Sequence, residues 1–189
     1  MITIYVIDNG GQWTHREWRV LKYLDVNTKI LPNTASYSEI QDVDGLVLSG
    51  GSPRIGIETH LGNCGMIFKK ATFPILGICA GHQFMARFFG GIAAPSKTPE
   101  FGKVELRIIK KGCPLLSHVE NRSIVWESHN DEVTKMPDCF HRYAESDNCS
   151  VQVMQHEEKP FFGLQFHPEV EHTEFGVRIF ENFISICKK

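Results

Sequence analysis

The sequence predicts an α/β fold of three layers: a mainly parallel central sheet with flanking helices, plus a small antiparallel sheet. Over the first 90 residues, short and almost wholly apolar runs alternate with helical stretches. Strands of that kind are buried on both faces, as in a parallel sheet that helices cover on each side. In the second half, apolar and polar residues alternate, which is typical of half-exposed antiparallel strands.

The first half divides into four strands and the helices between them. Residues 2–7 form a β-branched apolar run that stops at Asp-Asn-Gly-Gly, which predicts a buried strand and a tight loop. Gly62 and Gly65 weaken the helical pattern in one of the later segments. The remaining predicted elements are strands at 28–31, 45–49 and 74–78, and helices at 13–24, within 58–70, and at 83–89.

The second half predicts strands at 104–108, 151–153 and 161–166. Phe175, Ile179, Phe183 and Ile186 recur at helical spacing and predict a closing helix with one apolar face. Residues 93–102 contain two prolines and are expected to form a surface loop. The length of 189 residues suits one domain over residues 1–189.

Composition excludes several classes of function. Lys and Arg number 20 against 22 for Asp and Glu, so no basic excess exists to bind nucleic acid. No apolar run reaches the length of a membrane span, and the start has no basic leader, so we expect a cytoplasmic protein without a membrane partner. The six cysteines are scattered without a CxxC pair, which favours reduced thiols.

Cys79 is the candidate nucleophile. A buried strand ends at this cysteine and a helix begins immediately after it, with Gly77 and Gly81 allowing strand and helix to pack closely. This arrangement follows the logic of the nucleophile elbow, with sulfur in place of oxygen. Unpaired N–H groups at the helix N-terminus would favour a thiolate. The alternative is a packed core thiol in a turn.

A cysteine nucleophile needs a base, and His167-Pro-Glu169 supplies the best candidate. In extended chain, residues two apart face the same side, so His167 and Glu169 project together. Glu169 would accept from one imidazole nitrogen and leave the other to face the thiol, as in a catalytic triad. The alternative is an exposed turn at the end of a strand.

Acyl transfer also needs hydrogen-bond donors for the developing oxyanion. The loop Ser-Gly-Gly-Ser-Pro follows a parallel strand, whose carboxyl end should lie beside Cys79. The backbone N–H groups of Gly51 and Ala80 are the predicted donors. A phosphate loop is the alternative, although the Gly-Lys-Ser/Thr of a P-loop is missing. Cys79 and His82 have a C-x-x-H spacing without a second ligand pair, so we predict no metal site and a structural His82.

Together, Gly77-Ile-Cys79-Ala-Gly-His-Gln83, the upstream Ser-Gly-Gly and Gln165-Phe-His167-Pro-Glu169 resemble the class I glutamine amidotransferases. The order and spacing of these motifs agree over nearly the whole chain, which implies that family's fold. Two further segments, 126–133 and 171–176, are similar to the glutaminase part of GMP synthetases, and Asp-Asn-Gly-Gly-Gln near the start fits as well.

The resemblance implies that Cys79 is the nucleophile, His167 the base and Glu169 its orienter, with an oxyanion hole from the amides of Gly51 and Ala80. It also implies contacts to substrate glutamine from the residues Gln83, Ser128, His129 and Asn130. Two departures stand out. Ser52 separates Gly51 from Pro53, where this branch has Gly-Gly-Pro, and Ala80 replaces a larger residue.

The function that the resemblance implies is a glutaminase subunit that hydrolyses glutamine to glutamate and ammonia. An ATP-dependent partner chain, an ATP pyrophosphatase carrying ATP and Mg, would use the ammonia to convert XMP to GMP. No cofactor is expected on this chain. Three alternatives remain: an amidotransferase subunit of another synthetase, a stand-alone cysteine-dependent γ-glutamyl hydrolase, and a non-catalytic binding module. The polar segments 126–133 and 171–176 are expected to be exposed and to contact the partner.

Overall fold

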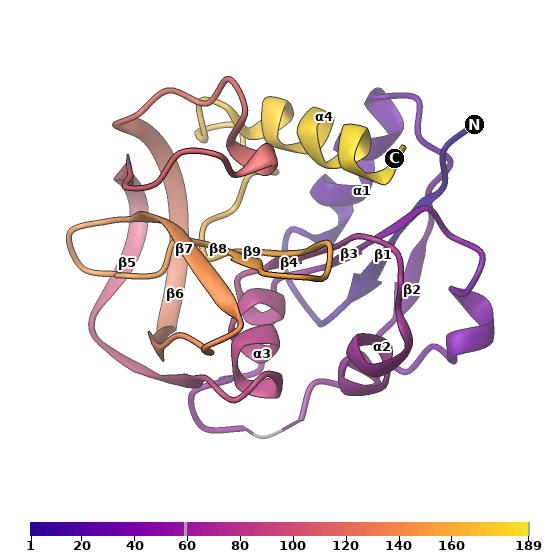
Figure 1. The fold of residues 1–189 in the computed structure, drawn as a ribbon, viewed down its shortest axis with the longest axis horizontal. Helices are drawn as coiled ribbons and strands as arrows, with labels where there is room; N and C mark the ends of the chain where they lie inside the picture. The colour runs from indigo at the N-terminus through magenta and orange to yellow at the C-terminus, as the bar shows by residue number, and fades with distance from the viewer. Residues whose placement is uncertain (59, 189) are drawn as a thin grey trace.

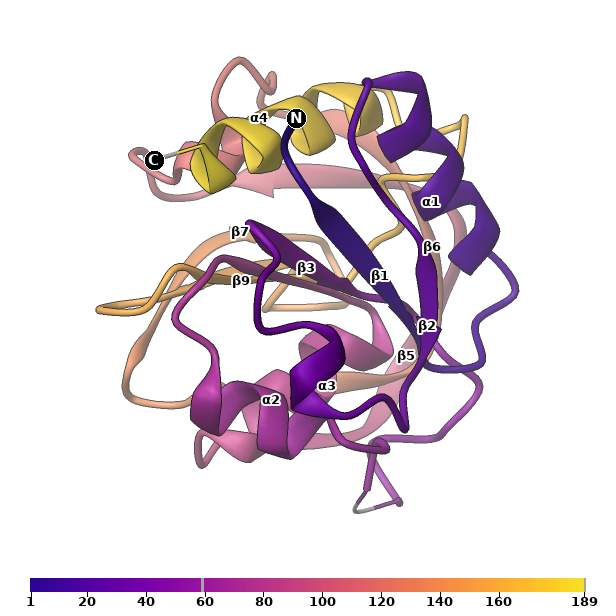
Figure 2. The ribbon, with the colours of Figure 1, turned by 90° about the vertical axis from the view of Figure 1, so that its right-hand side faces the viewer.

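A computed structural model describes residues 1–58 and 60–188, and its elements form three layers. The central sheet runs edge-on through the middle of Figure 1. Helices α1 (Thr14–Tyr23) and α4 (Gly176–Cys187) cover one face, and α2 (Cys64–Lys70) and α3 (Ala80–Phe88) cover the other, as Figures 1 and 2 both show. The predicted α/β three-layer fold is confirmed.

The sheet of the described residues has nine strands in the order β2-β1-β3-β4-β9-β8-β7-β5-β6. The first five in that order pair in parallel, and the remaining pairs are antiparallel. Parallel strands place their carboxyl ends at one edge, where sites of α/β proteins are built. The strands are β1 (Ile4–Asp8), β2 (Ile30–Pro32), β3 (Gly45–Leu48), β4 (Ile75–Ile78), β5 (Ile92–Ile108), β6 (Ser123–Lys135), β7 (Phe140–Glu145), β8 (Val153–His156) and β9 (Phe161–Leu164).

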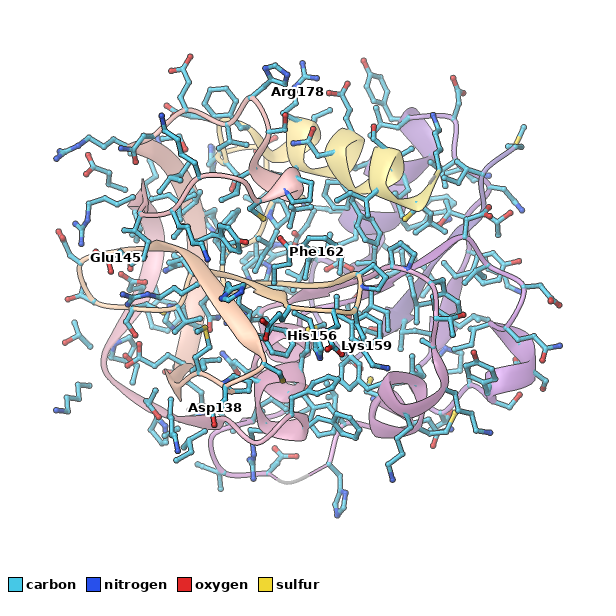
Figure 3. The ribbon with its side chains drawn as sticks, viewed as in Figure 1. Asp138, Glu145, His156, Lys159, Phe162 and Arg178 are labelled. Carbon is cyan, nitrogen blue, oxygen red and sulfur yellow. The ribbon has the colours of Figure 1, made fainter. Side chains whose placement is uncertain are left out.

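Two apolar clusters, one on each face of the sheet, form the core. Phe68 of α2 lies in the cluster beneath α2 and α3, whereas Phe162 and Phe180 lie in the cluster under α1 and α4. In Figure 3, Phe162 lies near the centre of the molecule, while Asp138 and Arg178 lie at its periphery. Because β3 and β4 are buried on both faces, their apolar runs show no alternation, as the sequence predicts.

The predicted surface loop at 93–102 is wrong, because these residues belong to the long strand β5. The pairing of β5 with β6 shifts register between Pro95 and Glu100, and the prolines fall at the two ends of that irregular stretch. Proline lacks the N–H that a regular ladder requires, so it is tolerated beside such an interruption. The helix expected within 58–70 is also shorter, since α2 begins at Cys64 and Gly62 has a left-handed φ of 50°.

Residues 126–133 belong to strand β6, and β7 is a strand that the sequence pattern did not predict. The short 3-10 helices η1 (Tyr37–Glu39) and η2 (Pro114–Leu116) complete the described elements. None of the helices in residues 1–58 and 60–188 combines the length and apolar character that a membrane span needs.

Candidate active site

Cys79 lies between β4 and α3 in a strained backbone conformation, with φ 48° and ψ −104°. Residues other than glycine rarely adopt such positive φ values, and backbone strain of this kind concentrates at functional sites. The turn is tight because a Cβ added to Gly81 would lie 2.5 Å from the Leu48 carbonyl oxygen, and one at Gly77 would lie 2.8 Å from the Gly81 carbonyl carbon. The predicted close approach of strand and helix is therefore present.

His167 and Glu169 lie beside this cysteine. The Nδ1 of His167 is 2.7 Å from a carboxylate oxygen of Glu169, and both residues are buried. Nδ1 donates to the carboxylate, and the other ring nitrogen is left to face the Cys79 thiol. Burial alone would lower the pKa of His167, but the Glu169 charge and the hydrogen bond with Cys79 hold it well above its usual value.

This combination favours a charged imidazolium beside the Cys79 sulfur, the kind of neighbour that activates a cysteine nucleophile. The edge of the Trp13 ring also packs against His167, with ring centroids 4.5 Å apart. The structure thus brings together the three residues of the predicted triad. Their catalytic roles stay predictions.

Two adjoining cavities meet at Cys79. One has a volume of about 250 Å³ and is lined by the triad together with Glu17, Trp13 and the loop after β1. The other has a volume of about 170 Å³ and gathers the remaining predicted site residues: Gly51, Ala80, Gln83, Ser128, His129 and Asn130. All nine predicted residues therefore line these two cavities, which share Gly51, Ser52, Cys79 and Ser128.

The loop with Gly50 and Gly51 packs tightly between the strand ends. A Cβ on Gly50 would lie 3.0 Å from the His167 ring, and one on Gly51 would lie 2.4 Å from the Asn9 carbonyl oxygen. Gly51 has no positive φ, so glycine is required there by close packing rather than by backbone twist. The Asn9 amide also donates to the Ser49 carbonyl at 2.9 Å, which ties the loop to the end of β1.

Gln83 is buried, and its amide nitrogen donates to the Asp131 carbonyl at 2.6 Å and to the Gln165 side-chain oxygen at 3.0 Å. Its donors are thus used within the protein, and its direct role is to hold the cavity wall. Gln165 in turn donates its amide to the Cys79 sulfur at 3.6 Å. The sequence shows Gln165 as part of a motif, but it gives no sign of this contact with the nucleophile.

The ring of His129 is buried, and both its nitrogens contact protein groups. Its Nδ1 is 3.0 Å from the Asp131 carbonyl oxygen, and its Nε2 is 3.2 Å from a carboxylate oxygen of Glu100. His129 and Asn130 both line the smaller cavity, and Asn130 is exposed.

Glu17 is a site residue that the sequence patterns missed. Its side chain comes from α1, is 1% exposed, and has one carboxylate oxygen without a hydrogen-bond partner. Burial raises the pKa of Glu17 well above its usual value, the nearby Glu169 adds to the rise, and the Gly50 N–H that hydrogen-bonds to it opposes it. No motif marks this residue, because only the packing of α1 against the loop brings it to the triad.

The expectation of exposure is wrong for 126–133, whereas in 171–176 the polar residues Glu171, His172 and Glu174 are exposed, as expected. Asp131 is buried, and both its oxygens bind the Arg54 guanidinium, with one contact of 2.6 Å. Glu174 is exposed, but its carboxylate accepts the Ile124 N–H at 2.8 Å. The alternation of β6 buries every second residue of that segment, which a reading based on polarity alone overlooks.

All six cysteines are free thiols. His82, expected to be structural, is fully buried, and burial lowers its pKa to about 3, so it stays neutral. Among the described residues, Glu100, His129 and Cys149 are close enough to share a metal ion, and they are separate from Cys79.

Comparison with known proteins places these residues in context. The family model for class-I glutamine amidotransferases matches residues 5–187. A glutamine-hydrolyzing GMP synthase subunit from Thermoplasma acidophilum is 50% identical over 188 residues, which cover 99% of this chain and 94% of that protein. The protein of the same name from Archaeoglobus fulgidus is 45% identical over 186 residues, covering 98% of this chain and 99% of the relative.

Solved structures agree. A Thermoplasma acidophilum crystal structure, described as that of a GMP synthase subunit, superposes with a TM-score of 0.94 at 49% identity, covering 100% of this chain and 94% of that one. A glutamine amidotransferase from Thermotoga maritima matches with a TM-score of 0.75 at 20% identity, covering 99% and 82% of the two chains. That second likeness concerns the fold alone.

Proposed function

This chain belongs to the class-I glutamine amidotransferase family, and from that premise we propose that it is the glutaminase subunit of a two-chain GMP synthetase. The observation that carries the proposal is the strained Cys79 facing the His167–Glu169 pair at the junction of two small cavities. These volumes lie below the roughly 300–1,000 Å³ of sites for drug-sized ligands, which suits a free amino acid such as glutamine.

The reaction follows from this geometry. In this proposal the Cys79 thiolate attacks the side-chain amide carbon of glutamine, and the backbone N–H groups of Gly51 and Ala80, which line the smaller cavity, stabilise the oxyanion. His167 then donates its proton to the leaving ammonia, which leaves a γ-glutamyl thioester on Cys79. A water molecule, deprotonated by His167, attacks the thioester and releases glutamate and the thiol. Glu169 keeps the imidazole oriented and stabilises its charged form.

The released ammonia needs an acceptor, and relatives that are named as one subunit of a GMP synthase imply a second chain. We propose that this partner is an ATP-dependent synthetase chain of the ATP pyrophosphatase type, which uses the ammonia to aminate XMP to GMP. In this proposal ATP and Mg bind the partner, and the glutaminase chemistry on this chain uses no cofactor.

The test combines purified chain and partner with XMP, ATP and Mg, and supplies either glutamine or ammonia. Cys79→Ala is expected to abolish GMP formation from glutamine and to preserve it from ammonia, because only the thioester step requires the thiol. Cys113→Ala, which removes a buried thiol remote from the cavities, is the matched control and should retain both activities.

A glutamine-like electrophile followed by mass spectrometry should label Cys79 and no other cysteine. If the chain hydrolysed glutamine but gave no GMP with this partner, it would serve another synthetase. If it cleaved γ-glutamyl peptides without any partner, the stand-alone hydrolase would be the correct assignment. Label on another cysteine would contradict the proposed mechanism itself.

A further inference from the structure

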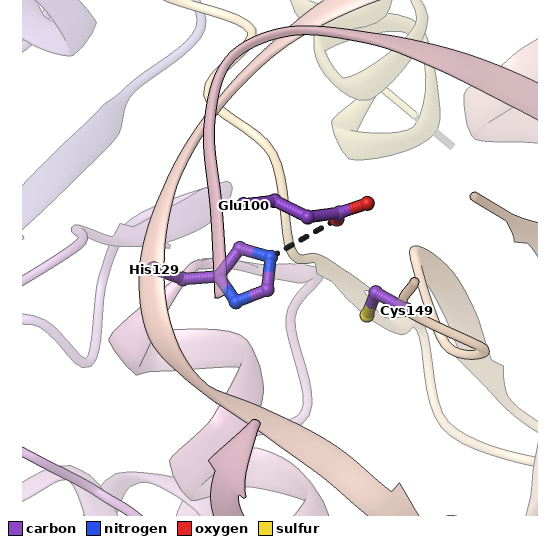
Figure 4. A group of neighbouring side chains, drawn as sticks. All are labelled: Glu100, His129 and Cys149. Carbon is purple, nitrogen blue, oxygen red and sulfur yellow. Dashed lines mark hydrogen bonds and ion pairs between the residues drawn. The ribbon is translucent and has the colours of Figure 1, made fainter. Parts of the chain in front are cut away.

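A group of four buried side chains lies on the antiparallel strands behind the active-site wall, and the proposed reaction does not use it. We refer to Glu100, Glu127, His129 and Cys149 as the His129 cluster. Each residue of the cluster is at most 3% exposed. Figure 4 shows Glu100, His129 and Cys149 converging, with the contact between His129 and Glu100 drawn as a dashed line.

Strand geometry explains the convergence. Glu127 and His129 are two apart on β6 and therefore face the same side. Glu100 on β5 is the cross-strand partner of His129, so its side chain lies on that same face. Cys149 enters from the segment between β7 and β8. One ligand atom each from Glu100, His129 and Cys149 lies within 4.8 Å of the others.

The imidazole of His129 has a defined tautomer. Its Nδ1 is 3.0 Å from the Asp131 carbonyl oxygen, which can only accept, so Nδ1 carries a proton. In the neutral ring, the Nε2 lone pair then faces two carboxylates, with Glu100 at 3.2 Å and Glu127 at 3.6 Å. Lone pair and carboxylate repel each other unless a positive charge lies between them.

The cluster also has unsatisfied polar atoms. Neither carboxylate oxygen of Glu127 has a hydrogen-bond partner, although the side chain is completely buried. Glu100 accepts hydrogen bonds from Ser146 and Gln152, so Glu127 is the carboxyl group of the cluster that is left without a donor. A buried carboxylate without a partner is strongly destabilising, and proteins resolve such sites with a cation or a proton.

We propose that the His129 cluster is a structural zinc site, ligated by His129 Nε2, the Cys149 thiolate and one Glu100 oxygen, whose ligand atoms lie within 4.8 Å of one another. The fourth ligand in this proposal is an oxygen of Glu127, which lies 3.6 Å from His129 Nε2 and moves onto the metal when zinc binds. One nitrogen, one sulfur and two oxygens form a donor set that Zn²⁺ accepts in tetrahedral geometry. All four positions come from protein, which is typical of a structural rather than a catalytic zinc site. Binding deprotonates the Cys149 thiol and releases that proton to solvent.

The residues around the cluster fit this assignment. Zinc-bound histidines donate their other ring N–H to a carbonyl or carboxylate, as His129 does to Asp131. Ser146 donates to the Glu100 oxygen Oε1 at 2.8 Å and would orient that ligand. Because Ser128, beside His129 on β6, lines both catalytic cavities, zinc would hold the cavity wall in place. The proposal does not depend on the identity of the substrate.

The first experiment measures metal in the full-length chain purified without chelators and then reconstituted with Zn²⁺. One zinc per chain is expected, together with a fall in Tm when the metal is removed by a chelator. Cobalt substitution should produce a thiolate-to-cobalt charge-transfer band that Cys149→Ser removes and Cys139→Ser retains, since Cys139 lies outside the cluster. A folded chain that takes up neither metal would overturn the proposal.

Graded variants provide a second readout. Ser146→Ala removes an outer partner and is expected to weaken zinc binding by roughly 10–100-fold, whereas Cys149→Ser and Glu127→Gln, which remove ligands, should weaken it more. Glu127→Gln also separates zinc from a proton on Glu127. If zinc holds this carboxylate, the variant lowers Tm only when zinc is present. A variant with unchanged zinc affinity and a raised Tm would show a protonated carboxyl instead.

Discussion

At the scale of single residues, the strain at Cys79 makes a prediction about stability. Ordinarily glycine is less stable than alanine in an ordered segment by about 0.5–1 kcal/mol. At the positive φ of Cys79 the order should reverse, because glycine relieves strain of roughly 1–3 kcal/mol. Cys79→Gly is therefore expected to unfold at higher urea concentration than Cys79→Ala, although both lack activity. Equal midpoints, or a more stable alanine variant, would show that the turn stores no strain.

His167 and Glu169 should contribute unequally to the rate of glutamine hydrolysis. His167 moves protons, so His167→Ala is expected to lower kcat by roughly 10²–10⁴. Glu169→Gln should cost less, because the amide still orients the ring. Since the Glu169 charge helps to raise the pKa of His167, its removal should shift the alkaline limb of kcat/KM to lower pH. An unmoved limb, or a Glu169→Gln variant slower than His167→Ala, would reverse the assigned roles.

The raised pKa of Glu17 predicts that the free energy of unfolding depends on pH. Its folded pKa is raised above the ordinary 4.5, so the folded state retains a proton that the unfolded state loses. Stability should then fall as pH rises above that value, by up to about 1.4 kcal/mol per unit until the folded pKa is passed. Glu17→Gln lacks this titration and can still accept the Gly50 N–H. Urea unfolding at several pH values should show that the free energy of unfolding of Glu17→Gln rises relative to that of wild type as pH rises. A difference between the two proteins that does not change with pH would contradict the prediction.

At the scale of elements, the loop after β3 gives a prediction about the oxyanion hole. A methyl group on Gly51 would collide with the Asn9 carbonyl oxygen, so Gly51→Ala should displace the loop. Losing one oxyanion donor costs roughly 10²–10³ in kcat. Gly65→Ala in α2 is the matched control, since its new methyl would meet Phe88 only at an ordinary 3.6 Å. If Gly51→Ala kept normal turnover, the oxyanion donor would have to be the backbone N–H of another residue, such as Ser52.

The elements that the sequence predicted well are those with continuous apolar runs. β3 and β4 are buried on both faces, so hydrophobicity alone identifies them. Only the last part of β5 was predicted, as the strand at 104–108. Its first part was missed because Pro95 and Pro99 normally indicate a loop, and only pairing with β6 makes that segment a strand. The two wrong predictions, loop 93–102 and exposed 126–133, concern strands that lie side by side in one antiparallel pair.

The residues of the candidate site also fall into two groups, those that sequence motifs identified and those that only the packing reveals. Cys79, His167 and Glu169 lie in short motifs whose local geometry follows from chain direction, so sequence alone suggested their convergence. Glu17 belongs to no motif, and Asp131 lies in segment 126–133, which does not reveal its partner. The environments of both depend on packing between α1, the loop after β3 and β6. Contacts between distant segments are the part that residue patterns do not encode.

At the scale of the whole molecule, the loop after β3 is held from two directions. Ser49 is buried and bonded to the Asn9 amide, which anchors one end to the parallel sheet. Arg54 binds Asp131 and anchors the other end to β6 in the antiparallel part. Because the short glycine-rich stretch is held at both ends, we expect a movement of β6 relative to the parallel strands to displace it. The side chain of Arg54 is 42% exposed, so a partner chain can reach that anchor.

This coupling predicts that the free chain is a poor glutaminase and that its partner activates it. Free hydrolysis would release ammonia without an acceptor, and a hundredfold activation needs only about 2.7 kcal/mol of differential binding to the competent loop. The measurement is kcat/KM for glutamine on the free chain, with partner, and with partner plus ATP and XMP. Glu171→Lys changes an exposed charge and should reduce activation while preserving the basal rate. Asp131→Lys disrupts a buried ion pair beside the cavity and should lower the basal rate itself. A free chain as fast as the complex would exclude activation by the partner, because the loop would then already be competent in the isolated chain.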